Sequence, residues 1–322
     1  MVKELKIRET GILLLLVLSA IVLAKHVNCP SGLPVKFSPI QDTINTAQEG
    51  ATIRVPRNIY FGVLKINKTL TLIGDNAIID ANGQQAGILI LAPNVILSGF
   101  TVQNVIRFPD AFGVPPEISE LDLEMDGSGI YVYQTRGTQI ENCSVTNCFM
   151  GVGIFQTVTV SLKTLNIYNT TWQVMLSYST DVQIFGSTIK DNFVREGGAA
   201  GIWIGQHSLM TLRNCTIENN MWGLIFQPET TYNKVQYNNF LNNTYNVYVH
   251  PVALWVGEFP NNYWSDYQGI DADGDGLGDT PYRINAYNAD PHPMMVDPPY
   301  TPPPKYEYQA GGGCPGKVPN PK

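Results

Sequence analysis

The middle of the chain repeats a unit of about 22 residues, and this repeat restricts the possible folds more than any other feature. Five aligned segments begin at residues 129, 151, 173, 201 and 223, at intervals of 22, 22, 28 and 22. Each opens with two apolar residues that alternate along the chain: Ile130/Val132, Val152/Ile154, Val174/Leu176, Ile202/Ile204 and Leu224/Phe226. A second apolar pair, five residues apart, follows: Ile140/Val145, Leu162/Ile167, Ile184/Ile189, Leu212/Ile217 and Val235/Phe240. Two residues later comes Asn147, Asn169, Asp191, Asn219 or Asn242.

This alternation predicts strands, because side chains of a strand point to opposite faces in turn. A fixed unit holding two or three short strands predicts one rung of a parallel β-helix, with rungs stacked about 4.8 Å apart. A β-sandwich is the alternative for short alternating strands, but it does not require a constant unit length. We expect ladders of apolar side chains inside and the Asn column at a corner, where left-handed backbone is tolerated.

The flanks extend this pattern into an expected organisation of the whole chain. Residues 87–104 resemble a further rung, residues 246–251 a partial last rung, and a short amphipathic helix bearing Ile40 and Ile44 opens the N-terminal cap. The register is interrupted at 105–128 and 192–200. We expect five parts: a signal peptide (1–24), an N-terminal cap with first strands (25–85), β-helix rungs (86–251), a C-terminal cap (252–297) and a Pro/Gly-rich tail (298–322).

The start of the chain predicts export. Its charged beginning is followed by an apolar run at 11–24, which is shorter than the roughly 20 residues a spanning helix needs and ends in small residues. We predict a signal peptide and a secreted or cell-surface protein without a transmembrane segment; an uncleaved anchor is the alternative. The five cysteines are an odd number, and Cys29 with Cys314 could join the two ends. With a net charge of −7 and no basic run, we expect no nucleic-acid partner.

Three motifs indicate a family. They are "IQDTINTA…GATIRVP…KTLTLIG" from residue 40, the "GI-x-[IV]" rungs, and the closing "NYWSDY…DADGDGLGDTPYRI…DPHPMM". Over residues 40–297 the chain resembles NosD-like right-handed β-helix proteins, within a wider class of carbohydrate-binding and sugar-hydrolase β-helices. The closing segment is similar to those that end archaeal secreted β-helix proteins. Ala51 and Asn58 depart from the family pattern, where Asp and Gly are common.

The stretch "DADGDGLGD" predicts a structural calcium site in the C-terminal cap. Carboxylates fall at positions 1, 3, 5 and 9 of a loop with Gly at position 6, and hard oxygen ligands at this spacing suit Ca²⁺. The expected ligands are Asp271, Asp273, Asp275, the Leu277 carbonyl, Asp279 and Asp290. Tyr282 occupies the position of the usual bidentate Glu, so a later acid must complete the shell, with Asp266 as the alternative to Asp290. An Asp/Gly turn without metal remains open.

The outward positions of the first strand column are apolar and aromatic. We predict an exposed stripe that binds glycan or a partner protein, because planar aromatic rings suit the faces of sugars. Its members are Tyr131, Tyr133, Phe155, Trp203 and Tyr248. The 106–127 loop or the tail could instead cover the stripe. No paired carboxylates occupy neighbouring rungs, so the sides of the solenoid argue against catalysis.

Three other functions stay open. A polysaccharide lyase or glycoside hydrolase would take its acids from the acidic 106–127 loop. A structural surface-layer or filament component would associate with itself through the tail. The resemblance to NosD implies copper handling, although "HPMM" at 292–295 is the only close group of His and Met. We also expect glycosylation at Asn67, Asn142 and Asn214, which begin Asn-x-Ser/Thr triplets.

Overall fold

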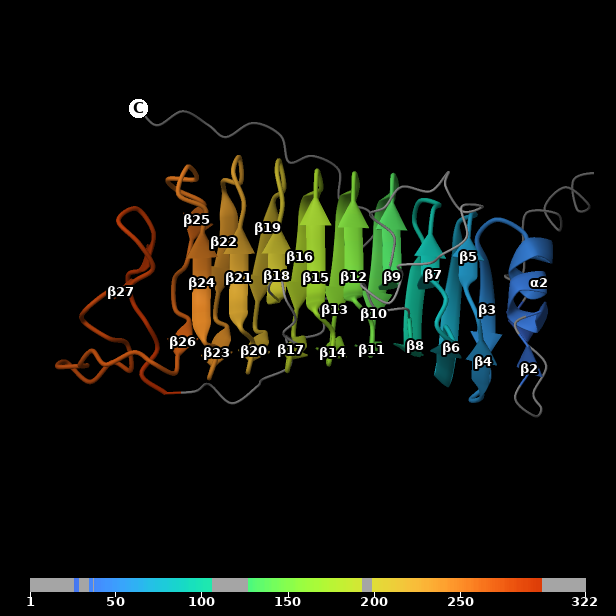
Figure 1. Cartoon of the computed structure of the whole chain (residues 1–322), viewed down its shortest axis with the longest axis horizontal. Helices are drawn as coiled ribbons and strands as arrows, with labels where there is room; N and C mark the ends of the chain where they lie inside the picture. The colour runs from blue at the N-terminus through green and yellow to red at the C-terminus, as the bar shows by residue number, and fades with distance from the viewer. Residues whose placement is uncertain (1–25, 29–34, 37, 106–126, 193–198, 297–322) are drawn as a thin grey trace, which may run out of the picture.

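The computed structural model describes residues 26–28, 35–36, 38–105, 127–192 and 199–296. These residues form an all-β parallel solenoid with one short helix, α2 (Ser38–Thr46), at one end. The predicted right-handed parallel β-helix is confirmed. Figure 1 shows the strands stacked side by side along the long axis, with β27 at the end opposite α2.

One face of the solenoid is an eight-stranded sheet in the order β24-β21-β18-β15-β12-β9-β7-β5. Its strands are β5 (Leu64–Ile66), β7 (Ala86–Ile90), β9 (Ser128–Tyr133), β12 (Met150–Phe155), β15 (Trp172–Ser177), β18 (Ala200–Ile204), β21 (Trp222–Phe226) and β24 (Tyr245–Val249).

The remaining faces belong to an eighteen-stranded sheet that bends around the solenoid. Its strands are β1 (His26–Asn28), β2 (Val35–Lys36), β3 (Ala51–Val55), β4 (Ile59–Phe61), β6 (Leu70–Asp80), β8 (Ile96–Gln103), β10 (Arg136–Glu141), β11 (Ser144–Thr146), β13 (Val158–Lys163), β14 (Asn166–Tyr168), β16 (Thr180–Phe185), β17 (Thr188–Lys190), β19 (Met210–Arg213), β20 (Thr216–Glu218), β22 (Asn233–Gln236), β23 (Asn239–Leu241), β25 (Gly257–Glu258) and β26 (Tyr263–Trp264). A small antiparallel pair, β27 (Tyr282–Arg283) and β28 (Ala289–Asp290), lies in the C-terminal cap.

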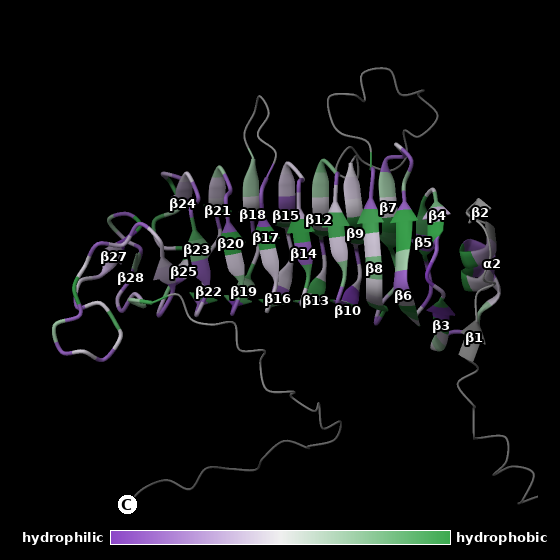
Figure 2. Cartoon of the chain, turned by 90° about the horizontal axis from the view of Figure 1, so that it is seen from below, coloured by the Kyte–Doolittle hydropathy of each residue, from purple (hydrophilic) through white to green (hydrophobic). Residues whose placement is uncertain are grey.

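The strand register confirms the predicted ladders. Ile130 pairs with Val152, Val152 with Val174, and the same column continues through Ile202 to Leu224. These inward side chains are fully buried and form one continuous core. In Figure 2 the hydrophobic colour lies along the strands, while the cap loops are more hydrophilic. Burial of such apolar columns provides the main driving force for folding.

The predicted Asn column lies at a left-handed corner. Its members all have φ between 51° and 55°: Asn147, Asn169, Asp191, Asn219 and Asn242. Asn and Asp tolerate this conformation because their side chains can hydrogen-bond locally. The Asn219 amide also donates to the Asp191 carboxylate at 3.0 Å, along the stack.

Both ends of the core are covered. Ile40 and Ile44 of helix α2 are buried over the first rungs, as the amphipathic pattern predicts. At the other end Phe240, Trp264 and Tyr282 stack in succession, with ring centroids 4.3 Å apart in each pair. Within the described ranges, no helix has the length and apolar character needed to cross a membrane.

Candidate functional site

The predicted aromatic stripe lies on the outer face of the eight-stranded sheet, but its N-terminal half is not exposed. Tyr131 is 1% exposed and Phe155 is 4% exposed, so the prediction of an open surface is wrong for these two residues. Their rings stack with centroids 5.4 Å apart, and Tyr131 also stacks on the half-buried Tyr133 at 5.8 Å. This region is a second, small apolar cluster outside the main core.

Gly153 explains how this cluster closes. It lies between Tyr131 and Met175 in the strand register, where the other rungs carry a side chain. A Cβ at this position would lie 2.7 Å from the Met150 sulfur and 2.9 Å from the Phe155 ring. The missing side chain lets both neighbours fold over the strand and bury the Tyr131 ring.

The C-terminal half of the face remains accessible. Trp203 and Tyr248 are half-buried, as is Trp222, and Tyr245 is 51% exposed. The Trp222 and Tyr245 rings stack at 4.2 Å with an interplanar angle of 22°, and the Tyr248 ring meets Trp222 edge-on at 5.2 Å. We call Trp203, Trp222, Tyr245 and Tyr248 the aromatic platform. It lies on three adjacent strands, β18, β21 and β24.

Sequence reasoning missed Trp222 and Tyr245 because alternation fails at the corner that opens each rung. In a strand, residues two apart point to the same face, so alternation from the buried Leu224 would place the Trp222 side chain inside the solenoid. The intervening position is glycine in most rungs, and a Cβ on Gly129 would lie 2.4 Å from the buried Val145 side chain. The corner therefore turns this position inward and the preceding residue outward. The recurring Gly before the apolar pair was the available signal.

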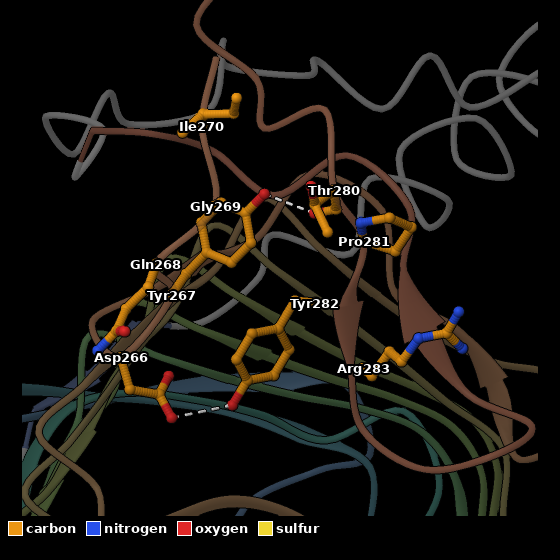
Figure 3. Close-up of a pocket in the computed structure, with 9 residues that line it drawn as sticks. All are labelled: Asp266, Tyr267, Gln268, Gly269, Ile270, Thr280, Pro281, Tyr282 and Arg283. Atoms are coloured by element: carbon orange, nitrogen blue, oxygen red, sulfur yellow. Dashed lines mark hydrogen bonds between the residues drawn. The ribbon is translucent and has the colours of Figure 1, made fainter. Parts of the chain in front are cut away.

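A cleft of about 440 Å³ opens in the C-terminal cap (Figure 3). Its lining combines aromatic and polar groups: Asp266, Tyr267, Gln268, Gly269, Ile270, Thr280, Pro281, Tyr282 and Arg283. The buried Asn246 side chain connects the two features. It follows Tyr245 in sequence, and its amide lies 2.9 Å from Asp266 and 3.1 Å from the Tyr282 hydroxyl.

The cleft walls are held by tyrosine hydroxyls. The Tyr267 hydroxyl donates to the Thr280 carbonyl at 2.5 Å, and the Tyr282 hydroxyl donates to the Asp266 carboxylate at 3.2 Å. Burial raises the pKa of Tyr282 to about 12, so its hydroxyl stays a donor throughout the physiological range. The Arg283 side chain is exposed and makes no ion pair with another described residue.

The Asp-rich loop leaves from one wall of the cleft and returns to it. Carboxylate oxygens of Asp271, Asp273 and Asp275 lie within 4.8 Å of one another. Backbone N–H groups of Gly276, Gly274 and Asp275 donate to Asp271, and the first of these does most to hold the pKa of this carboxyl below its usual range. This is the only cluster of three or more His, Cys, Asp or Glu side chains in the described part of the chain.

The side chains of Asp279 and Asp290 are not part of this cluster. Asp279 accepts the Ala272 N–H at 2.6 Å across the neck of the loop, while the Leu277 N–H donates to Asp275. Asp290 is fully buried in the cap, where its two oxygens accept the N–H groups of Asn261, Asn262, His292 and the Trp264 indole. Asp290 therefore lies apart from the cluster of three carboxylates, and its place in the metal shell stays a prediction.

Some carboxylates on the described sides of the solenoid have a basic partner, whereas Asp181, Glu218 and Glu258 make no ion pair with a described residue. Glu141 pairs with Lys163 at 3.2 Å, and the Glu229 carboxylate lies 3.0 Å from the His207 imidazole. Several predictions lie outside the described residues: nearly all of the acidic 106–127 loop, the tail, the signal peptide, and Cys29 with Cys314. The side chains of Cys143, Cys148 and Cys215 are buried.

Comparison with known proteins shows which family this chain resembles. The family described as periplasmic copper-binding protein (NosD) matches residues 116–269. The resemblance to NosD-like β-helix proteins is confirmed. A probable ABC transporter binding protein NosD of Stutzerimonas stutzeri is 32% identical over 111 residues, which are 34% of this chain and 25% of the relative. The match thus spans about a quarter of the curated relative's length.

Solved structures share the solenoid. An alginate lyase from Paenibacillus sp. str. FPU-7 superposes with a TM-score of 0.55 at 13% identity, covering 76% of this chain and 88% of the enzyme. A Geobacillus virus E2 protein, ORF18, gives a TM-score of 0.49 at 14% identity, covering 80% of this chain and 60% of that one. At 13% identity, the similarity to the alginate lyase shows a shared fold and nothing about function. Nothing is inferred from the viral protein, whose TM-score is below 0.5.

Proposed function

We propose that this chain is a non-catalytic extracytoplasmic protein, secreted or held at the cell surface, that binds glycan through the aromatic platform. The observation that carries the proposal is the stacked pair of Trp222 and Tyr245, which lies accessible on a rigid parallel sheet. A contiguous group of accessible aromatic rings on a protein surface is typical of a binding site.

The platform has the chemistry that a sugar chain requires. The C–H faces of pyranose rings pack against flat aromatic rings, and the sheet fixes those rings before the ligand arrives. The cleft in the cap, which Asn246 contacts, adds a carboxylate, an amide and a guanidinium from Asp266, Gln268 and Arg283. These groups could hydrogen-bond to sugar hydroxyls or pair with a uronate.

Catalysis is the alternative, and it depends on the 106–127 loop. The alginate lyase shares the fold, but the fold by itself does not determine chemistry. Within the described residues, the one cluster of three or more acidic side chains lies in the Asp-rich loop of the cap and not on a side of the solenoid. The binding proposal is therefore better supported by the geometry.

Binding and cleavage can be separated in one experiment. The protein is incubated with soluble and insoluble polysaccharides, and both its depletion and the appearance of new reducing or unsaturated ends are measured. We expect depletion without new ends, and at least a fivefold weaker association for Tyr245→Ala. Tyr178→Asn is a matched control, because Tyr178 is also 51% exposed but lies outside the platform, with a left-handed φ that suits Asn. Equal loss in both variants, or new ends, would contradict the proposal.

We also propose that the loop at 271–279 binds Ca²⁺ and stabilises the cap. The converging oxygens of Asp271, Asp273 and Asp275 fit a hard divalent cation better than copper, which prefers imidazole, thiolate or thioether ligands. The donor set of this cluster thus does not fit the metal named in the family description. When bound, the cation would neutralise the mutual repulsion of the three carboxylates.

Calcium removal provides the test. At a free Ca²⁺ concentration 100 times the Kd, binding would add about 2.7 kcal/mol to the free energy of unfolding. We expect chelation to lower the Tm of the full chain, and Asp273→Asn with Asp275→Asn to remove that response. A Tm that does not change with Ca²⁺, or that responds only to copper, would refute the assignment.

The predicted modification sites support the same location. Asn67 and Asn142 are exposed, and Asn214 is half-buried. Glycosylation at these three residues would place the protein outside the cytoplasm, and mass spectrometry of the native protein would detect it.

A further inference from the structure

A second groove, of about 390 Å³, lies in the C-terminal cap and is not part of the proposed glycan surface. It is lined by Trp255, Phe259, Pro260, Tyr287 and Pro291, together with the exposed Glu258. Tyr287 is 60% exposed and Trp255 39%. Tyr232, 70% exposed, meets the Trp255 ring edge-on at 5.4 Å and extends the apolar surface.

The groove is built on rigid elements. Glu258 belongs to β25, which pairs in register with β22. The Asn288 side chain accepts the Val256 N–H at 3.0 Å and donates to the Leu254 carbonyl at 2.8 Å, so the two walls are joined. Pro260 and Pro291 restrict the backbone of each wall. A preformed groove of aromatic rings and prolines is the surface that polyproline II segments bind.

The chain itself contains such a segment. Residues 298–305 read "PPYTPPPK", which includes a Pro-x-x-Pro spacing from Pro299 to Pro302 and a basic residue at Lys305. Proline-rich sequence favours the polyproline II conformation and loses little entropy on binding. Glu258 makes no ion pair with a described residue and could receive the Lys305 ammonium at the end of the segment.

The segment can reach the groove of its own molecule. Val296, the last described residue, follows groove residue Pro291 by only five positions, a span of at most about 18 Å. Pro302 to Pro304 lie six to eight residues further on, enough to return over about 20–29 Å. A tether this short gives an effective concentration in the millimolar range, which favours the same chain over a second copy.

We propose that the groove at Trp255 and Tyr287 binds the proline-rich segment 298–304 of the same chain, with Lys305 beside Glu258. The tail then covers the apolar end of the cap. This surface is separate from the aromatic platform, so the inference does not depend on glycan binding.

Zero-length carbodiimide cross-linking of the full chain tests the contact. We expect a Lys305–Glu258 cross-link in the monomer, and no Lys305 cross-link to Glu229, an exposed carboxylate outside the groove. Trp255→Ala should lower the yield at least fivefold. Because that variant could disturb the cap, Pro302→Ser with Pro303→Ser, outside the described body, should give the same loss.

An equal mixture of ¹⁵N-labelled and unlabelled protein identifies the occupant. The proposal is supported if every cross-link joins two labelled peptides or two unlabelled peptides. Mixed-isotope cross-links would assign the groove to a second copy and overturn it. A cross-link yield unaffected by either set of substitutions would overturn it as well.

Discussion

Asp290 terminates a ladder of buried amides inside the solenoid. Asn238 accepts the Cys215 N–H at 3.0 Å, Asn262 accepts the Asn238 N–H at 3.0 Å, and Asp290 accepts the Asn262 N–H at 2.8 Å. Each Asn also donates to a backbone carbonyl of an earlier rung. The final member, Asp290, donates to no carbonyl and accepts N–H groups at both oxygens, which requires a carboxylate.

Replacing Asp290 with Asn tests this requirement. The amide nitrogen of Asn would face N–H donors on one side, leaving buried donors unpaired, so we expect a loss of about 2–4 kcal/mol in the free energy of unfolding. Burial raises the pKa of Asp290, while the N–H groups of Asn262 and Trp264 oppose that rise. Urea denaturation measures the change, with the exposed Asp181→Asn as the matched control. Equal free energies of unfolding for the two variants would show that the Asp290 carboxylate does not stabilise the cap.

The strands and the corners between them differ in how well the sequence predicts which side chains are buried. Alternation within strands places Ile140, Leu162 and Ile184 in one buried column, as observed. A periodic pattern also predicts outward positions, but it cannot tell which of them become covered. Tyr131 and Phe155 are buried through packing around Gly153, a contact between rungs. At corners the backbone leaves the two-residue period, so alternation alone does not place the Trp222 side chain on the outer face, where it stacks on Tyr245.

Corners also carry the buried thiols of Cys143 and Cys215. Burial raises the pKa of Cys143 from 9.0 to about 11 and that of Cys215 to about 12. A raised pKa in the folded state means that the unfolded chain releases these protons first. The two thiols therefore contribute stability that is complete below pH 9 and is lost as the pH rises toward 11–12.

The expected loss between pH 8 and pH 10 is about 1 kcal/mol for each thiol. Urea unfolding at the two pH values measures it, and the Cys143→Ala/Cys215→Ala variant removes both groups. This variant will be less stable at each pH because of the cavities it creates, but its stability should depend less on pH. If both proteins show the same pH dependence, the thiols do not titrate as inferred.

At the scale of the whole molecule, stability depends on how the ends are closed. Each rung contacts only its neighbours, so an uncovered last rung would expose apolar side chains and unpaired strand edges. The stack of Phe240, Trp264 and Tyr282 extends the core beyond the last complete rung and into the cap. Trp264 is buried, and its indole also donates to Asp290 at 3.0 Å.

Truncating Trp264 should therefore affect association as well as stability. We expect Trp264→Ala to lose about 3–5 kcal/mol and to aggregate at concentrations where the parent stays monomeric, because the last rung becomes accessible to another molecule. Trp264→Phe keeps the stacked ring but loses the indole N–H, so it should lose less stability and stay monomeric. Light scattering and urea denaturation measure the two effects. Trp203→Ala, the same truncation on the side of the solenoid, should leave the oligomeric state unchanged; aggregation of that variant to the same extent would show that exposed apolar area, and not the open end, drives association.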